Sequence, residues 1–346
     1  MKRYLFVLIS FLLCLQDSSV LADSPDTSQR VQLLFFGDIN LGRTVGQKLL
    51  QGATDFPFAE VRSRCNNADI VFGNLESIIS DQNGETVSPT SNIVFCAPPI
   101  AAEVLRDAHF AVLSLANNHT FDYGVKGIRD ACASLDEVGI AYTGIIPETS
   151  AIAPPVIIEK NGIRIGFVAY TKVLNFQKGK HYVAFFDSAR ASDDIATLQK
   201  QVDFIIASYH GGIEYGDKED PVSVREMKML ADFGARIVVG HHPHVPLGIH
   251  RYNGAWIFSS LGNFVFYQPQ RYWTQYGIGA ECEIEKDGNG NCTITSIELW
   301  PVKAGYQPKF SMTQVESEKL FQRIKALSTS NLHQTERGYS VELYSE

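Results

Sequence analysis

The chain has 346 residues, of which 30 are lysine or arginine and 38 are aspartate or glutamate. Hydrophobic residues make up 45% of it, enough for a sizeable core, and the length fits one large α/β domain or two smaller ones. A mildly acidic chain without a basic stripe lacks the surface that nucleic acid requires, so we exclude nucleic acid as a partner.

The first residues have the pattern of a secretory signal peptide. Two basic residues at positions 2–3 precede an apolar run at 5–15, and small residues suited to cleavage stand at 20–22. The run is short for a bilayer span, so we expect a signal peptide over residues 1–22 that is cleaved after Ala22. The mature protein is then exported, either periplasmic or extracellular.

Two other interpretations of this segment stay open. The apolar run could remain as an uncleaved anchor, or Cys14 could mark a lipoprotein, although Leu13 before it is larger than that pattern usually has. After the signal peptide we expect a short segment at 23–30, one domain over 31–303, and a C-terminal helix and tail over 304–346.

From residue 31 onward, short apolar runs alternate with amphipathic stretches. The runs are nearly continuous in apolar residues, which is typical of strands buried on both faces. Several of the amphipathic stretches end in glycine, as helices often do. The runs are 31–36, 69–74, 110–115, 164–170, 203–208 and 235–239, and the helical stretches are 101–108, 124–139, 188–201 and 222–234. This alternation predicts an α/β fold with covered sheets.

The C-terminal part has a different pattern, with antiparallel strands joined by tight turns and a final helix. These segments are 254–266, 279–286 and 292–302 for the strands and 317–330 for the helix. Cys282 and Cys292 flank Asp-Gly and Asn-Gly steps, which are strong hairpin signals. Cysteines on adjacent strands can meet the geometry of a disulfide, so we expect a Cys282–Cys292 bond.

Polar clusters begin where the apolar runs stop. Open α/β sheets bind ligands outside the carboxyl ends of their strands, so these clusters could meet in one site. They supply Asp38, Glu76, Asn118, His210, His242 and His244. A mixed set of imidazole and oxygen ligands suits Mn, Zn or Fe rather than Ca. We therefore expect a divalent metal ion at one or two positions.

Each of these residues, taken singly, also has a structural explanation. Asp38 could cap a helix that begins near Thr44, Asn118 could be a turn residue, and His210 could be a core histidine with a satisfied hydrogen bond. Clusters at five successive strand ends nevertheless favour one shared site over coincidence.

Three of the nine histidines fall in the stretch GHHPHV, residues 240–245. Side chains two apart on an extended segment point to the same side, so His242 and His244 should both reach a site in front of the strand ends. His241 should then point the other way. Pro243 restricts the backbone between the two ligands and lowers the entropy lost on ordering them.

Six motifs occur in an order typical of one family. They are GDINLGR, GNLES, LANNHTFDYG, HGGIEY, GHHPHV and SLGNFVF. Over about residues 31–266 they resemble the CapA or PgsA-type family of capsule (poly-γ-glutamate) synthesis proteins. The resemblance implies the fold of calcineurin-like metallophosphoesterases, a four-layer sandwich of two β-sheets flanked by helices. It also implies export and, as partners, an anionic polymer or phosphoester substrate and a membrane synthase complex.

The same resemblance implies roles for individual residues. Asp38 matches the first metal-binding aspartate of the phosphoesterase pattern. Asn118 and His119 match an Asn-His motif in which the asparagine binds metal and the histidine acts as an acid or stabilises developing charge. The remaining imidazole ligands match His210, His242 and His244.

Two departures from that pattern weaken one of the two metal positions. Asn40 stands where the pattern has a histidine, and Asn74 where it has the aspartate that bridges both ions, with Glu76 two residues further on. Asn74 and Glu76 are both candidate ligands. The position that keeps Asn118 should hold metal more tightly than the other.

Arg43 and Glu214 belong to the family-like motifs but not to the general phosphoesterase pattern. The guanidinium of Arg43 suits an anionic ligand, because its planar fork matches a carboxylate or a phosphate. A structural salt bridge is the alternative. We expect both residues to bind substrate, with Arg43 and His119 also acting in catalysis.

These features predict an exported protein that makes, exports or trims an anionic cell-surface polymer such as poly-γ-glutamate. Two other hypotheses stay open. One is an active metal-dependent hydrolase of phosphoesters or amides. The other is a non-catalytic module that binds a polymer or a partner and keeps only the shell of the site.

We expect the mature N-terminus to be Asp23, because residues 20–22 match the small-residue pattern of a cleavage site after the apolar run. N-terminal sequencing of the protein isolated from its host checks this. An intact Met1 on a soluble cytoplasmic species would contradict export.

Overall fold

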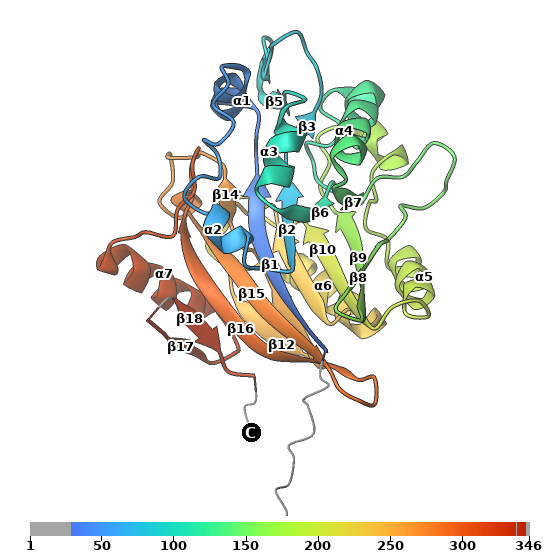
Figure 1. Cartoon of the computed structure of the whole chain (residues 1–346), viewed down its shortest axis with the longest axis vertical. Coiled ribbons are helices and arrows are strands. Elements are labelled where there is room, and N and C mark those ends of the chain that lie inside the picture. The colour runs from blue at the N-terminus through green and yellow to red at the C-terminus, as the bar shows by residue number, and fades with distance from the viewer. Residues whose placement is uncertain (1–28, 337, 344–346) are drawn as a thin grey trace, which may run out of the picture.

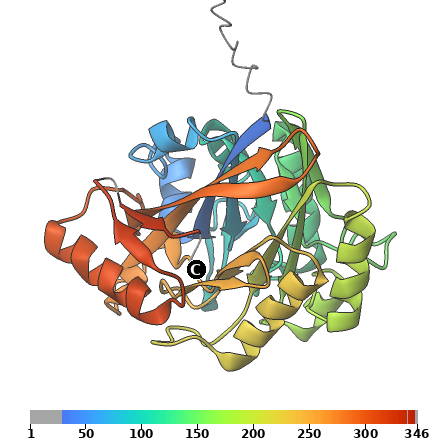
Figure 2. The ribbon, with the colours of Figure 1, turned by 90° about the horizontal axis from the view of Figure 1, so that it is seen from below.

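A computed structural model describes residues 29–336 and 338–343 of the chain, so the predicted signal peptide and its cleavage site lie outside the described residues. Two β-sheets stack on each other and helices cover their outer faces (Figure 1). The view from below shows the strands of the two sheets inside and the helices toward the periphery (Figure 2). The predicted α/β four-layer sandwich is confirmed.

The first sheet has the strand order β17-β18-β16-β15-β1-β2-β6-β7, with β14 also paired to β1. Its central strands β1, β2, β6 and β7 are parallel, whereas β15 and β16 run antiparallel. The strands are β1 (Gln29–Ile39), β2 (Ile70–Leu75), β6 (Phe110–Ser114), β7 (Ala141–Thr143), β14 (Asn263–Val265), β15 (Tyr276–Lys286), β16 (Cys292–Lys303), β17 (Leu332–Gln334) and β18 (Tyr339–Val341).

The second sheet has the order β12-β13-β11-β10-β9-β8, and its four inner strands are parallel. The strands are β8 (Val156–Lys160), β9 (Ile163–Thr171), β10 (Phe204–His210), β11 (Ile237–His241), β12 (Ile249–Tyr252) and β13 (Ala255–Phe258). A small third sheet holds β3 (Ile78–Ile79), β5 (Ser91–Ala97) and β4 (Val87–Ser88).

Seven α-helices and two 3₁₀ turns are found in the described part of the chain. They are α1 (Arg43–Leu50), α2 (Arg62–Cys65), α3 (Ala101–Asp107), α4 (Gly124–Val138), α5 (Ser188–Leu198), α6 (Pro221–Phe233) and α7 (Gln314–Leu327), with η1 (Gln177–His181) and η2 (Trp273–Gln275). None of these helices is both long and apolar enough to cross a membrane.

Strand β1 shows why the sheets stack. Its alternating side chains face two different cores: Leu33 and Phe35 pack between the sheets, and Leu34 and Phe36 pack toward the helices. A strand that is apolar on both faces must be covered on both faces. The rings of Phe72 and Phe167 stack across the space between the sheets, with centroids 6.0 Å apart.

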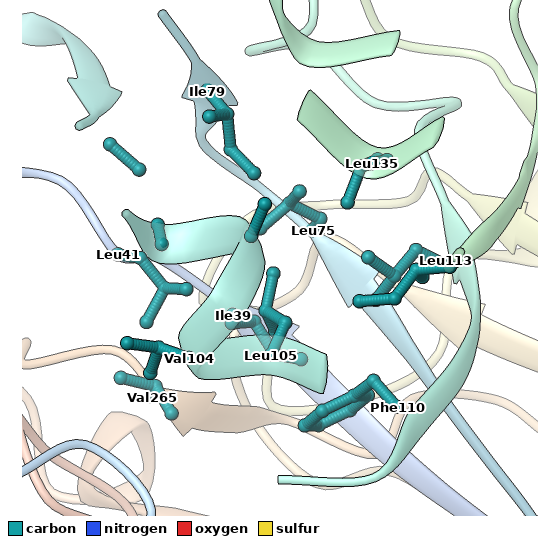
Figure 3. Packing of buried hydrophobic residues seen from close by; sticks show 14 of the residues in the cluster. Ile39, Leu41, Leu75, Ile79, Val104, Leu105, Phe110, Leu113, Leu135 and Val265 are labelled. Atoms are coloured by element: carbon teal, nitrogen blue, oxygen red, sulfur yellow. The ribbon is translucent and has the colours of Figure 1, made fainter. Parts of the chain in front are cut away.

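Helices α3 and α4 cover the first sheet, and α5 and α6 cover the second. Figure 3 shows Val104 and Leu105 of α3 beside the sheet residues Ile39 and Phe110, with Leu135 of α4 near Leu75 and Leu113. Asp220 caps α6 by accepting a hydrogen bond from the Ser223 backbone N–H, and Pro221 occupies its first turn. These helices leave the carboxyl ends of the parallel strands available for a site.

The C-terminal segment is more than the predicted helix and tail. Helix α7 is present, but β17 and β18 follow it, and β18 pairs with β16 of the first sheet. Leu320, Phe321 and Ile324 of α7 join the core between the sheets. Residues 304–336 and 338–343 therefore extend the main sandwich.

The predicted disulfide is wrong. Cys282 and Cys292 do lie on the adjacent antiparallel strands β15 and β16, but the register places Cys282 opposite Ile297 and Cys292 opposite Lys286. Both thiols are buried and free. Turn chemistry alone located the hairpin correctly, but it did not set which residues face each other along the two long strands.

We expect Leu105→Ala to lower the free energy of unfolding by about 2–5 kcal/mol, because it empties a fully buried position between α3 and the first sheet. Denaturant unfolding of the variant and the wild type measures this. Leu50→Ala is the control, since Leu50 is 46% exposed and its change should stay near 0.5 kcal/mol. Equal losses in the two variants would contradict this account of the core.

Candidate metal centre

The strand ends of the two sheets bring the predicted polar residues together. Asp38 is the penultimate residue of β1, Glu76 follows β2, and His210 ends β10. His242 comes directly after β11 in the second sheet. All four side chains are buried, so residues far apart in the sequence share one interior site at the carboxyl edge of both sheets.

Two groups of side chains have the geometry to hold a metal ion. The first is Glu76, His210 and His242, and the second is Asp38, Glu76 and His244. Within each group the ligand atoms all lie within 4.8 Å of one another. Glu76 is common to both groups, which is the position of a carboxylate that bridges two ions.

The unpaired atoms of this site test whether a cation fits. Oδ2 of Asp38, both carboxylate oxygens of Glu76 and Nδ1 of His242 are buried without a hydrogen-bond partner. A buried polar group left unsatisfied costs about 1–3 kcal/mol, and more when it is charged. Lone pairs from carboxylates and imidazole that converge unpaired are what a divalent cation requires, so the residues fit a metal centre.

Asn74 has a different place from the one expected. Its Nδ2 donates to Oδ1 of Asp38 at 2.9 Å and lies 3.3 Å from Nδ1 of His210. Its Oδ1 accepts from Nδ2 of Asn117 at 3.1 Å. If the amide of Asn74 were flipped, its oxygen would face Oδ1 of Asp38 and its nitrogen would face Nδ2 of Asn117. Both contacts would be repulsive, so the orientation described is favoured. Asn74 therefore orients Asp38 and His210, which departs from the expectation that it binds metal.

The two buried carboxylates have opposite pKa shifts. Burial alone raises the pKa of Asp38, but the nearby imidazoles of His241 and His244, with Nδ1 atoms 3.4 Å and 3.2 Å from its oxygens, outweigh burial and hold that pKa well below its usual range. Burial raises the pKa of Glu76 well above its usual range, and the charge of Asp38 adds to the effect. A divalent cation beside Glu76 would favour its ionised form and reverse that shift.

The two imidazoles in the first ligand group are held neutral. Burial lowers the pKa of His210 well below its usual range, and the charge of His242 adds to this. Burial also lowers the pKa of His242 to about 4, with a further contribution from His244. Metal binds the neutral imidazole, so both rings are ready as ligands at neutral pH.

The histidine stretch reaches the site by sharp turns rather than as an extended segment. Strand β11 ends at His241, and the φ angles of His242 and His244 are +95° and +58°. The predicted extended backbone is therefore wrong, although both side chains do enter the ligand groups. His241 is buried with Nδ1 3.4 Å from Oδ1 of Asp38, so it lies behind that carboxylate and outside both groups.

Asn118 and His244 connect the ligand groups to their surroundings. Oδ1 of Asn118 lies 2.8 Å from Nε2 of His210, and its Nδ2 donates to Asn175 at 3.2 Å. His244 places Nδ1 2.9 Å from Oδ1 of Asn263 and Nε2 3.6 Å from Oε1 of Glu76. The amide oxygen of Asn118 thus contacts His210 of the first group, and its role as a metal ligand stays a prediction.

His119 is paired with a carboxylate that the sequence analysis missed. Its Nδ1 donates to Oδ2 of the buried Asp122 at 2.8 Å, and its ring stacks on Phe95 at 4.2 Å. Asp122 also accepts from the backbone N–H of Phe95 at 3.1 Å. The spacing of three residues between His119 and Asp122, in the motif HTFD, was the available signal. The pairing fixes the ring and leaves Nε2 for a substrate.

A cleft of about 150 Å³ opens in front of the ligand groups. Its lining includes Arg43, Asn118, His119, Glu214 and His244. The Arg43 guanidinium lies 4.5 Å from the ring centroid of Phe95, and its Nη2 donates to the Asn92 carbonyl at 2.6 Å. Arg43 therefore lines the cleft and makes no ion pair among the described residues, which removes the salt-bridge alternative.

Glu214 stands at the opening of the same cleft. Its side chain is 48% exposed, and Oε1 lies 3.7 Å from Nε2 of His244. The neighbouring Tyr215 stacks on His244 with ring centroids 5.8 Å apart. A larger cavity of about 330 Å³ lies elsewhere, against α4 and β7, but it is lined mainly by apolar side chains and contains neither ligand group.

The four-layer sandwich with a carboxylate and imidazole centre at its strand ends has the metallophosphoesterase-like architecture expected above. The chain belongs to the family described as bacterial capsule synthesis protein PGA_cap, whose model matches residues 32–268.

Proteins similar to this chain include two from Bacillus. The capsule biosynthesis protein CapA of Bacillus anthracis is 30% identical over 79% of this chain and 68% of its own length. The PGA biosynthesis protein CapA of Bacillus subtilis (strain 168) is 32% identical over 81% of this chain and 74% of its own length. Among solved structures, the NAD nucleotidase of Haemophilus influenzae is 15% identical with a TM-score of 0.46, covering 87% of this chain and 64% of that one.

We expect His242→Ala to weaken binding of Mn²⁺ at least a hundredfold, because it removes a ligand from the first group. His241→Ala is the matched control. His241 lies outside both groups, with its Nδ1 3.4 Å from Oδ1 of Asp38, so its loss should weaken binding less than tenfold. Calorimetry of metal-free protein measures both. Equal losses in the two variants would show that His241 is itself a ligand.

Proposed function

We propose that this protein is a metal-dependent phosphoester hydrolase that acts in the making, export or trimming of an anionic cell-surface polymer. The observation that carries the proposal is the place of Glu76 in both ligand groups. The sequence pattern has Asn74 where a bridging aspartate is expected. The carboxylate of Glu76, two residues later, would be a ligand at both positions, and Asn74 hydrogen-bonds Asp38 and lies beside His210.

Two divalent ions in these groups would generate a nucleophile from water and neutralise charge on the phosphoryl oxygens. The remaining work falls to side chains in the cleft. Arg43 is held by Phe95 and the Asn92 carbonyl, which directs its guanidinium toward an anionic group. Asn118 and His244 line the same space.

His119 is placed to move the proton. Hydrolysis joins the oxygen of water to phosphorus, breaks the bond from phosphorus to the ester oxygen, and requires a proton on the leaving oxygen. Because Nδ1 of His119 is occupied by Asp122, Nε2 can deliver that proton. Asp122 holds the ring in one orientation through Nδ1, as a carboxylate behind a catalytic imidazole does.

The family assignment guides the biological setting of this activity. The curated relatives carry names that refer to capsule or PGA biosynthesis, and the same setting is proposed for this chain. Export of the protein accounts for the signal-peptide pattern of residues 1–22. Outside the cytoplasm the protein would meet its polymer and a membrane synthase complex.

We expect the protein loaded with Mn²⁺, Zn²⁺ or Fe²⁺ to hydrolyse aryl phosphate esters, and a chelator to abolish the activity reversibly.

Glu76→Gln should lower kcat/KM at least a hundredfold and release both ions, since it removes a ligand from both groups. His119→Asn should lower kcat by about 10²–10⁴ and retain the metal. Steady-state kinetics and metal analysis of the same samples measure these effects.

Matched controls separate chemistry from folding. Glu226 is also a buried glutamate, but it pairs with Tyr209 and Lys172 away from the ligand groups, so Glu226→Gln should retain its metal. His109→Asn changes an exposed histidine and should retain full activity. A wild-type protein that binds metal and hydrolyses no phosphoester would overturn the proposal and favour a non-catalytic module that binds polymer.

A further inference from the structure

Several exposed apolar residues stand in the chain at or beside the lining of the metal cleft. Ten large hydrophobic residues are exposed in the described part of the chain, and four of them line the cleft or are next in sequence to a residue that does. They are Ile93, Phe176, Ile213 and Tyr267, with 59%, 40%, 61% and 47% of their surfaces exposed. We name these four residues the apolar rim.

The chain positions of the apolar rim place it at the cleft. Ile93 lines the cleft directly, and each of the others is next to a residue that does. Phe176 follows Asn175, Ile213 precedes Glu214, and Tyr267 stands between Phe266 and Gln268. Consecutive Cα atoms are about 3.8 Å apart, so the backbone of all four lies at or beside the cleft lining. They come from four separate segments of the chain, so their grouping comes from the fold and not from one apolar stretch of sequence.

The cleft itself accommodates only a small group. Its volume of about 150 Å³ equals the space of about five water molecules at ~30 Å³ each, and pockets that enclose whole small molecules have about 300–1,000 Å³. A phosphate or a similar head group therefore enters the cleft. The rest of a larger substrate extends out of the cleft, past Ile93 at its lining.

The charges around the opening suit an anionic head group. Arg43 lines the cleft, and Arg271 lies with its guanidinium 4.9 Å from the ring centroid of Tyr215, another lining residue. Lys178 and Lys180 are exposed on η1, close in sequence to Phe176 of the rim. Basic groups beside exposed apolar ones match a molecule with an anionic end and an apolar body.

We propose that the substrate is an amphiphile whose phosphate ester head lies in the metal cleft and whose apolar chain lies across the apolar rim. This inference rests on the proposed hydrolysis and specifies its substrate. A polyanionic chain fits less well, because its charged repeats would lose water against Ile93 and Ile213 and would meet the carboxylate of Glu214. A lipid phosphate that carries or anchors a polymer has the required chemistry.

A series of n-alkylphosphonates tests the inference without turnover, because the phosphorus–carbon bond resists hydrolysis. Ethyl-, butyl-, hexyl- and octylphosphonate are titrated into the Mn²⁺-loaded protein by calorimetry, below the concentrations at which they aggregate. Full burial of one CH₂ group strengthens binding about fourfold. We expect about twofold for each CH₂ on a half-open rim, roughly 60-fold from ethyl to octyl, with a heat-capacity change that becomes more negative.

Variants of the rim locate the effect. Phe176→Ser and Ile213→Ser should each lower the ratio of octyl to ethyl affinity about three- to fivefold, because each removes part of the apolar contact. Val315→Ser is the matched control, since Val315 is 64% exposed on α7 and does not line the cleft. It should keep the wild-type ratio. Thermal melting of all three variants checks that they fold.

The outcomes separate this inference from the proposed function. If all phosphonates bind with equal affinity, the rim contacts something else, such as a protein partner, and the amphiphile is excluded while hydrolysis stands. The same holds if the rim variants keep the wild-type ratio. If no phosphonate binds and no phosphoester is hydrolysed, the proposed function and the inference both fail.

Discussion

The burial of two carboxylates at one point between the sheets is the constraint on which the rest of the site depends. Asp38 and Glu76 are both fully buried, and three of their four oxygens lack a hydrogen-bond partner. Two like charges in a low-dielectric interior repel strongly unless positive charge lies between or beside them. The opposite pKa shifts of the two groups express this conflict. A divalent cation in each ligand group would remove this conflict, so a bound metal would stabilise the buried carboxylates as well as supply chemistry.

The backbone around the site is strained in a way that supports the ligands. Eight non-glycine residues have positive φ in the described part of the chain, and four of them, Arg43, Tyr215, His242 and His244, belong to this site. Such conformations cost about 1–3 kcal/mol each and persist only where the surroundings enforce them. Close approach of the backbone also shapes this site: a Cβ on Gly37 would lie 1.8 Å from the Gly262 carbonyl oxygen. This glycine lets β1 and the β14 segment meet directly beside Asp38.

Much of the architecture could be predicted from the sequence, because strands buried on both faces are apolar along their length. The polar clusters after those strands located Asp38, Glu76, His210 and His242, since a parallel sheet gathers its carboxyl ends at one edge. The register of paired strands and the backbone geometry of turns were harder to predict from the sequence. The pairing of Cys282 depends on where two long strands meet, and the backbone at His244 depends on contacts with distant residues.

The roles of the amides were also beyond reach of the sequence. Asn74 occupies the position of a ligand in the family pattern, and whether its amide binds a cation or orients a carboxylate is decided by Asn117, which takes up its oxygen. Asp122 was missed for a related reason. An aspartate three residues after a histidine is common, and only the fold shows that its carboxylate is buried behind the ring.

The apolar rim and the charged side chains of the cleft would act on two parts of the same substrate. Electrostatic interactions inside a site strengthen as water leaves it, and a cleft of about 150 Å³ with a charged interior is filled by water when it stays open. A polar rim would keep that water. Exposed side chains such as Ile213 and Phe176 gain by contact with an apolar body, so a substrate that carries one closes the mouth as it binds. The free energy of that contact then excludes water from Arg43, His119 and the ligand groups at the moment when their charges act on the head group.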